Sequence, residues 1–273
     1  MSNASTRPFS VRRLPDFTAI AITCFVLLYG PIVTIVVYSF NAGDSVALWR
    51  GFSTQWYYIA AQNATVQEAT LRSLVIALWA AGISTVLATM AALGTTRTRN
   101  FKGRTLIYML INQPLMVPEI VTAVALLIFF SSIKIATGYS GLAYLIVAHS
   151  AFCIPFAYLP IRARMEGMDL ALESAAADLY ATPWNTFRRI TLPLMAPGIA
   201  AGGMLAFVVS LDDVIITEFV KSAGQDTLPT YMLGQLRRAV TPEVNAISTA
   251  LLVLTVLLLT VFFILSGRNA AKS

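Results

Sequence analysis

The stretch MDLALESAAADLYATPWNTFRRITLPL, residues Met168–Leu194, is a polar segment between two long apolar runs. Asp169 can cap a short helix that follows it. Thr182 and Pro183 then end that helix and can start another, because proline disfavours helix in the residue before it and suits a first helical turn. Small alanines on the first helix let another surface approach closely, so we expect a docking element on one side of a membrane. Its apolar stripe, at three-and-four spacing, consists of Leu172, Ala175, Ala176 and Leu179.

This segment matches most of a known motif, which consists of E-A-A, then G, then I-x-L-P. The matching residues are Ala175, Ala176, Asp178, Leu179, Ala181, Ile190, Leu192 and Pro193. Two positions depart from it: Ser174 replaces the glutamate, with Glu173 one residue earlier, and Tyr180 replaces the glycine. A one-residue shift turns a helical side chain by about 100°. The alternative to a motif match is a plain alanine-rich loop helix.

In this pattern the segment resembles the EAA signature of the membrane subunits of bacterial ATP-binding-cassette (ABC) importers. The resemblance implies a MetI-like, type I importer transmembrane domain whose cytoplasmic coupling helix sits in a cleft of a separate ATPase. It also implies that movement reaches the membrane through the packing of Trp184, Phe187 and the Leu192–Pro193 junction. The ATPase-coupling residues expected from it are Glu173, Ser174, Ala175, Ala176, Asp178, Leu179, Tyr180, Ala181 and Trp184.

The composition is that of an integral membrane protein. Hydrophobic residues make up 57% of the 273 residues and charged residues only 12%. Crossing a bilayer as a helix takes about 20 apolar residues. We therefore predict an all-α fold with six transmembrane helices at Phe17–Phe40, Ser73–Thr95, Leu106–Phe130, Leu142–Pro160, Leu194–Leu211 and Ala246–Leu265.

Most of the 19 Lys and Arg residues fall on one side of these spans, which indicates the cytoplasmic side of a bacterial inner membrane. Both termini and the Met168–Leu194 segment then lie in the cytoplasm. We predict a basic tail at residues 1–16, a permease domain at 17–267 with the coupling loop at about 163–193, and a tail at 268–273. The net charge of +6 suits these flanks and anionic lipid, and it does not argue for nucleic acid.

The sequence carries no signal for catalysis. It has no GxxxxGK[ST] phosphate loop, so ATP hydrolysis is expected in another subunit and no cofactor in this one. Cys24 and Cys153 lie inside predicted spans and are interpreted as packing residues, so no metal site is expected. A membrane-embedded enzyme would need HExxH or paired-metal spacing, and the chain has one histidine.

Ionisable residues inside a membrane usually face a bundle interior or a watery path. The translocation candidates are Glu119, Asp212, Asp213 and His149. Glu119 is expected about 13 residues into the third span, roughly 20 Å from its cytoplasmic end and at a depth overlapping that of Asp212. Carboxylates from two helices would suit a cation. Alternatively, the aspartates sit at the outer interface, and His149 is a structural hydrogen-bonding residue.

Further motifs extend the resemblance over nearly the whole chain: YGPIVTIVVYSFN, GFSTQWY, PEIV, HSAFCIPF, SLDDV and TPEVNA. They resemble the PotC-type permeases of spermidine/putrescine importers. The resemblance implies a second permease subunit, an ABC ATPase dimer, a periplasmic solute-binding protein and a polyamine cargo. Related importers carry aminophosphonates, opines or amino-acid derivatives, so the cargo stays open.

A self-contained cation channel or proton-coupled carrier is the main rival function. It would use Glu119 and Asp212 directly and need no nucleotide. We find no inverted repeat between the two halves, which weighs against it. Gly198 and Gly202 form a GxxxG pair, which we interpret as ordinary packing within one subunit.

Overall fold

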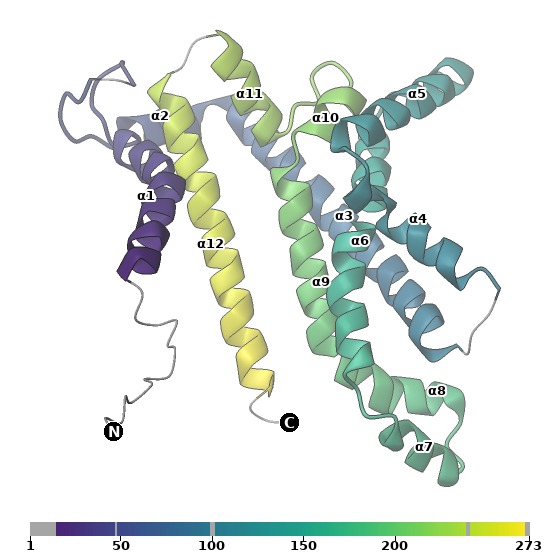
Figure 1. Ribbon diagram of the computed structural model, residues 1–273. Helices are drawn as coiled ribbons and strands as arrows, with labels where there is room; N and C mark the ends of the chain where they lie inside the picture. The colour runs from purple at the N-terminus through teal and green to yellow at the C-terminus, as the bar shows by residue number, and fades with distance from the viewer. Residues whose placement is uncertain (1–14, 47, 99–101, 239–240, 271–273) are drawn as a thin grey trace, which may run out of the picture.

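The computed structural model describes residues 15–46, 48–98, 102–238 and 241–270, and most of them are helical (Figure 1). Six helices in these ranges are long and apolar enough to cross a membrane, which confirms the predicted all-α membrane fold. The elements are α1 (Pro15–Tyr38), α2 (Gln55–Gln62), α3 (Ala64–Arg97), α4 (Arg104–Met116), α5 (Glu119–Thr137), α6 (Ala143–Glu166), α7 (Ala171–Asp178), α8 (Pro183–Thr186), the π-helix η2 (Phe187–Thr191), α9 (Leu192–Asp212), α10 (Ile215–Val220), α11 (Leu228–Arg238) and α12 (Pro242–Ala270).

Only part of each predicted terminal tail lies within the residues that the structure describes. All but the last two residues of the expected tail at 1–16 lie outside the described ranges. At the other end, α12 continues to Ala270, past the expected boundary at residue 267.

The core of the molecule is the packing of α3, α6 and α9 against one another (Figure 1). Small residues make this close approach possible, as is usual where helices meet in a membrane. A Cβ on Gly202 would lie 2.5 Å from the Ala157 carbonyl oxygen of α6, and one on Gly198 would lie 2.6 Å from Cβ of Arg164. The GxxxG pair therefore packs within the subunit, as predicted. The fully buried alanines of this core include Ala77, Ala80, Ala88, Ala92, Ala148 and Ala157.

The third predicted span is not one helix. The expectation of a continuous helix over Leu106–Phe130 was wrong, because α4 ends at Met116 and α5 begins at Glu119. Pro118 lacks an N–H and forces the residue before it out of the helical region, and Val117 is indeed extended, with φ −97° and ψ 137°. Glu119 therefore lies in the first turn of a new helix.

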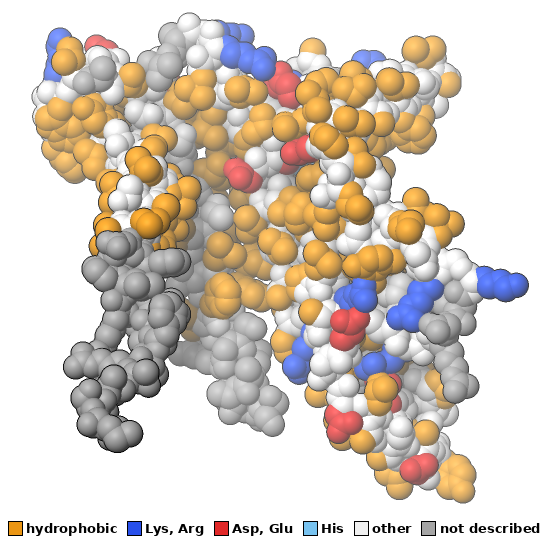
Figure 2. All heavy atoms as spheres, in the orientation of Figure 1, with side chains coloured by type: hydrophobic (Ala, Val, Ile, Leu, Met, Phe, Trp, Pro, Cys, Tyr) orange, Lys and Arg blue, Asp and Glu red, His pale blue; other side chains and the backbone are white. Residues whose placement is uncertain are grey.

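Helices α1 and α12 lie side by side, away from the α3–α6–α9 core over much of their length (Figure 1). Their apolar side chains are widely exposed; Leu27 of α1 is 71% exposed and Phe263 of α12 is 70% exposed. In Figure 2 hydrophobic atoms cover the middle of the visible face, while most charged side chains lie along the upper edge and over the lower right, from the lower ends of α3, α4 and α6 to the lobe of α7 and α8. This distribution fits a molecule surrounded by lipid.

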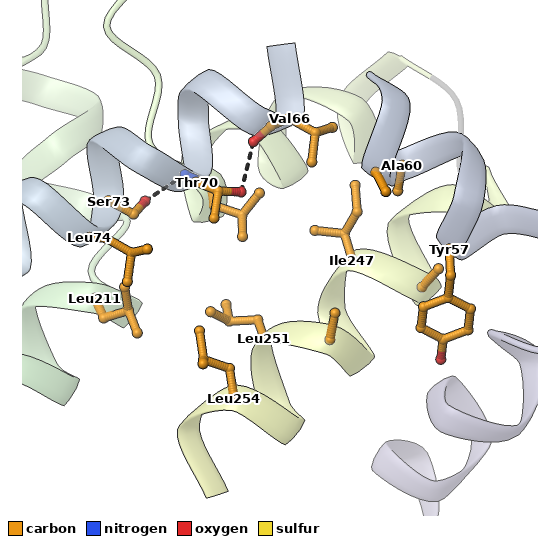
Figure 3. Close-up of a pocket in the computed structure, with 14 residues that line it drawn as sticks. Tyr57, Ala60, Val66, Thr70, Ser73, Leu74, Leu211, Ile247, Leu251 and Leu254 are labelled. Carbon is orange, nitrogen blue, oxygen red and sulfur yellow. Dashed lines mark hydrogen bonds between the residues drawn. The ribbon is translucent and has the colours of Figure 1, made fainter. Parts of the chain in front are cut away.

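An apolar pocket lies between α12 and the helices that face it (Figure 3). It has a volume of about 220 Å³, and side chains of α2, α3, α9, α11 and α12 line it. Leu251 and Leu254 point into it opposite Leu74 and Leu211 (Figure 3). The Ser73 hydroxyl accepts a hydrogen bond from the Leu228 N–H at 2.8 Å, which fixes the start of α11 against α3.

Candidate functional site

The loop between α6 and α9 folds into two short helices, as the sequence predicts. The Asp169 carboxylate accepts the Ala171 N–H at 2.9 Å, so it satisfies a free donor at the start of α7. After α7, the Thr182 hydroxyl accepts the Asn185 N–H at 3.4 Å, and Pro183 is the first residue of α8. Of the predicted apolar stripe, only Ala176 is buried against the molecule.

An exposed apolar knob, formed by Leu179, Tyr180 and Trp184, projects from this loop. Their exposed fractions are 82%, 96% and 66%. Tyr180 has φ +59°, a left-handed conformation that costs a residue with a Cβ roughly 1–2 kcal/mol. The backbone thus keeps the shape that glycine would adopt at this motif position, and adds a tyrosine side chain at its tip. Large exposed apolar groups of this kind mark a site of interaction with another protein or with a membrane.

Glu173 points inward, toward the rest of the chain. Its Oε1 atom lies 3.1 Å from Nη2 of Arg97 on α3 and accepts a hydrogen bond from the Thr191 hydroxyl at 3.0 Å. The Arg97 and Glu173 side chains are 21% and 24% exposed. One carboxylate oxygen therefore fastens α7 to both α3 and η2. The adjacent Ser174 only bonds the Leu170 carbonyl of its own helix, at 3.2 Å.

The Glu173–Arg97 ion pair is not predictable from the sequence, where Arg97 is one of 19 Lys and Arg residues. Many oppositely charged pairs are conceivable between two loops, and only the path of α3 past α7 selects this one.

The helix that carries the loop back into the membrane is continuous. α8, η2 and α9 follow one another without a gap from Pro183 to Asp212. The rings of Trp184 and Phe187 lie 5.7 Å apart, between centroids, at the start of this rod. The predicted transmission path through Trp184, Phe187 and the Leu192–Pro193 junction therefore runs along one helical element.

The candidate carboxylates gather where α9 ends and α10 begins. Asp213 is buried and accepts the N–H groups of Ile216 and Thr217, each at 3.2 Å, so it caps α10. Glu119 is half-buried at the start of α5, which packs against α10. Asp212 is exposed. Acidic side chains stand among hydrophobic atoms below the upper edge in Figure 2.

His149 is fully hydrogen-bonded in the core. Its Nδ1 lies 2.8 Å from the Ser210 hydroxyl of α9, and its Nε2 lies 2.9 Å from the Thr217 hydroxyl of α10. Nε2 is also 3.7 Å from the Asp213 carboxylate, and both side chains are 1% exposed. This geometry fits the structural alternative for His149, a residue that cross-links α6, α9 and α10.

A charged cluster follows α10. The Lys221 ammonium donates to Glu218 at 2.5 Å and to Asp226 at 2.7 Å. Partial burial opposes the charge on Lys221, but the hydrogen bonds to Asp226 and Glu218 outweigh it and raise the pKa of this lysine. Glu218 is also within 3.7 Å of Arg237, so it is held by cations and is a poor candidate for binding a cationic solute.

A core of membrane-spanning helices, with a helix pair presented at one end, defines a polytopic membrane protein. The chain belongs to the family described as "Binding-protein-dependent transport system inner membrane component", whose model matches residues 84–272. This membership makes it a membrane subunit of a transport system that works with a solute-binding protein.

Curated relatives cover most of the chain. The "Putrescine transport system permease protein PotI" of Escherichia coli K12 is 37% identical over 245 residues, 89% of this chain and 87% of that protein. The "Spermidine/putrescine transport system permease protein PotC" of Escherichia coli K12 is 34% identical over 234 residues, 86% and 87% of the two chains. The PotC of Haemophilus influenzae is also 34% identical, covering 90% and 94%.

Solved structures share the fold. A chain of a bacterial ABC transporter involved in import of the acidic polysaccharide alginate matches with a TM-score of 0.71 and 16% identity, over 93% of this chain and 94% of that one. A chain of the MetNI methionine ABC transporter, in an inward-facing conformation, matches with a TM-score of 0.64 and 17% identity, over 74% and 94%. The predicted fold of an ABC importer permease is therefore confirmed.

Proposed function

We propose that this chain is one of two permease subunits of an ATP-driven importer of polyamines such as putrescine and spermidine. The observation that carries the cargo is the likeness, over about nine-tenths of the chain, to permeases named for those solutes. The carboxylates of Glu119 and Asp212 support it, because a polycation needs negative charge along its path, whereas that of Asp213 is buried as the cap of α10. Aminophosphonates, opines and amino-acid derivatives are the alternative cargoes.

The coupling loop would lie in the cytoplasm, with both termini, in the domain arrangement predicted from the sequence. The knob of Leu179, Tyr180 and Trp184 would enter a cleft of a separate ABC ATPase dimer, since it is the most exposed apolar feature of the loop. The opposite end, with α2 and α11, would then face a periplasmic solute-binding protein. A second, PotB-like permease would complete the path.

Transport in this proposal is alternating access without chemistry on the cargo. ATP binding closes the ATPase pair and carries the knob with it. The Glu173–Arg97 and Glu173–Thr191 contacts pass that movement to α3 and to the η2–α9 rod. The bundle then opens outward to receive the solute, and hydrolysis resets it.

Coupling is tested with two substitutions at Tyr180 in the complete importer, reconstituted with its ATPase and loaded binding protein. Tyr180→Phe keeps the ring and should retain stimulated ATP hydrolysis. Tyr180→Gly relieves the strained backbone but removes the side chain, so stimulation should fall several-fold while basal hydrolysis persists. Full stimulation in Tyr180→Gly would remove the knob from the coupling path.

Cargo is tested by uptake of radiolabelled putrescine into the same vesicles. Glu119→Gln and Asp212→Asn should slow uptake several-fold, whereas Glu68→Gln, on a side chain 74% exposed near the start of α3, should not. Uptake that proceeds without nucleotide would favour the channel or carrier. Uptake unaffected by either substitution would make the carboxylates structural.

A further inference from the structure

We propose that a cavity between the ends of α3, α4 and α6 binds the phosphate of an anionic phospholipid in the cytoplasmic leaflet. The proposal rests on the membrane orientation given under Proposed function. The cavity lies at the end of α6 that leads to the coupling loop and does not include the acidic residues near α10. It has a volume of about 460 Å³ and is lined by Thr95, Arg104, Thr105, Tyr108, Tyr158 and Arg162.

Aromatic side chains hold one of the two arginines in place. The Arg162 guanidinium carbon lies 4.7 Å from the ring centroid of Tyr108 and 6.0 Å from that of Tyr158. Tyr158 is fully buried, and its hydroxyl shares a hydrogen bond with the Thr95 hydroxyl at 2.9 Å. A guanidinium stacked in this way loses little freedom on binding, and its planar fork matches two phosphate oxygens.

The charge of the cavity selects an anion. The residues that line it include two arginines, Arg104 and Arg162, and no acidic residue; Glu166, 2.8 Å from Nε of Arg162, is 54% exposed and lies outside this lining. The surroundings are therefore net positive. A polyamine would be repelled here, so the cavity is distinct from the acidic candidates for the cargo path.

The neighbouring surface indicates that the anion is a lipid. Just after Arg104, α4 exposes a row of large apolar side chains that would contact acyl chains, while the arginines hold the head group. Inorganic phosphate would use the arginines and leave this row uncovered. Basic residues at the cytoplasmic end of a span are where anionic head groups gather. The exposed row consists of Leu106, Ile107, Met109 and Leu110.

Such a lipid would act on transport through α4. A phosphate bridging Arg104 and Arg162 ties α4 to α6. Because α4 leads through the break at Pro118 to Glu119, the lipid would fix the position of that carboxylate. Importer activity should therefore depend on anionic lipid even though the cargo is a cation.

The test measures lipid binding to the complete, purified importer by native mass spectrometry. The probes are phosphatidylglycerol, phosphatidylcholine, and phosphatidylcholine with inorganic phosphate. We expect retention of phosphatidylglycerol, and a loss of about 10- to 30-fold in the double variant Arg104→Gln/Arg162→Gln, since each basic residue contributes about 1 kcal/mol near an anionic surface. Lys102→Gln removes a nearby exposed cation that does not line the cavity and should change binding little.

Three results would overturn the proposal. The first is unchanged phosphatidylglycerol binding in the double glutamine variant. The second is that inorganic phosphate occupies the site as well as phosphatidylglycerol does and displaces it. The third is that the double glutamine variant loses the ATPase from the complex while it still binds the lipid. The last would assign the arginines to a protein partner. Arg104→Lys/Arg162→Lys keeps both charges but loses the planar fork and its stacking, so it should bind phosphatidylglycerol less tightly than the unmodified importer and more tightly than the glutamine variant, which separates loss of charge from misfolding. Lipid binding is measured without transport, so its failure would leave the proposed cargo untouched.

Discussion

Breaking the Glu173–Arg97 pair should loosen α7 without unfolding the permease. At 3.1 Å and an effective dielectric constant of about 20, the Coulomb attraction is about 5 kcal/mol. Desolvation and side-chain ordering offset most of it. With both side chains about a fifth to a quarter exposed, we expect a net coupling of about 1–2 kcal/mol, between the values for exposed and buried pairs.

The assay is hydrogen exchange of the backbone amides in α7, followed by mass spectrometry of the intact importer. Glu173→Gln and Arg97→Gln should each speed exchange about tenfold, the factor that corresponds to 1.4 kcal/mol. The double variant should be little worse than either single one, because both remove the same contact. ATP hydrolysis stimulated by the loaded binding protein should fall in all three variants.

Glu68→Gln serves as the comparison. Its ion pair with Arg72 is 4.0 Å long and its own side chain is 74% exposed, so exchange of the α7 amides should stay near that of the unmodified protein. Additive effects of Glu173→Gln and Arg97→Gln, or normal α7 protection in either, would show that the pair does not hold the loop, and the transmission route argued from it would fall.

Two further predictions concern the core. Gly202→Ala places a Cβ 2.5 Å from the Ala157 carbonyl oxygen and should cost about 1–3 kcal/mol of stability, whereas Gly94→Ala, whose Cβ meets nothing within 4 Å, should cost none. Thermal unfolding in detergent compares the two variants, and equal melting temperatures would disprove the close contact between α6 and α9. His149→Leu removes the hydrogen bonds to the Ser210 and Thr217 hydroxyls and should destabilise the protein by about 2–4 kcal/mol. Uptake abolished at unchanged stability would instead make His149 a proton carrier.

Span number and helical class follow from the sequence because the bilayer imposes them. The backbone N–H and C=O groups of a spanning segment must hydrogen-bond to one another, so a long apolar run that crosses the bilayer is helical. The loop was predictable for a similar reason: Asp169, Thr182 and Pro183 act locally, on residues one to three positions away.

The effect of a proline was not predictable from the sequence. Pro118 separates two helices, while other prolines sit inside helices whose neighbours accommodate the lost hydrogen bond. Which outcome occurs depends on packing around each site. The prolines found inside helices are Pro31, Pro114, Pro155, Pro160 and Pro197.

The contacts that the candidate-site residues make were not predictable from the sequence either. Asp213 looked like one of two adjacent acids, yet it caps α10 while Asp212 is exposed. Glu173 looked like a displaced motif acid, yet it bonds Arg97. Neighbours in sequence have different roles because one faces the core and the other faces outward.

The wide turn η2 contains one residue more than an α-helical turn would need. An extra residue advances the azimuth of everything before it by about 100° relative to α9. Deleting a single residue from Phe187–Thr191 would let the rod wind uniformly, and Trp184 would then point to a different quadrant. Such a deletion variant should insert in the membrane and pack its core normally. Its apolar knob would no longer point at the proposed ATPase cleft, so ATP hydrolysis would be uncoupled from solute movement by a change of helical phase alone.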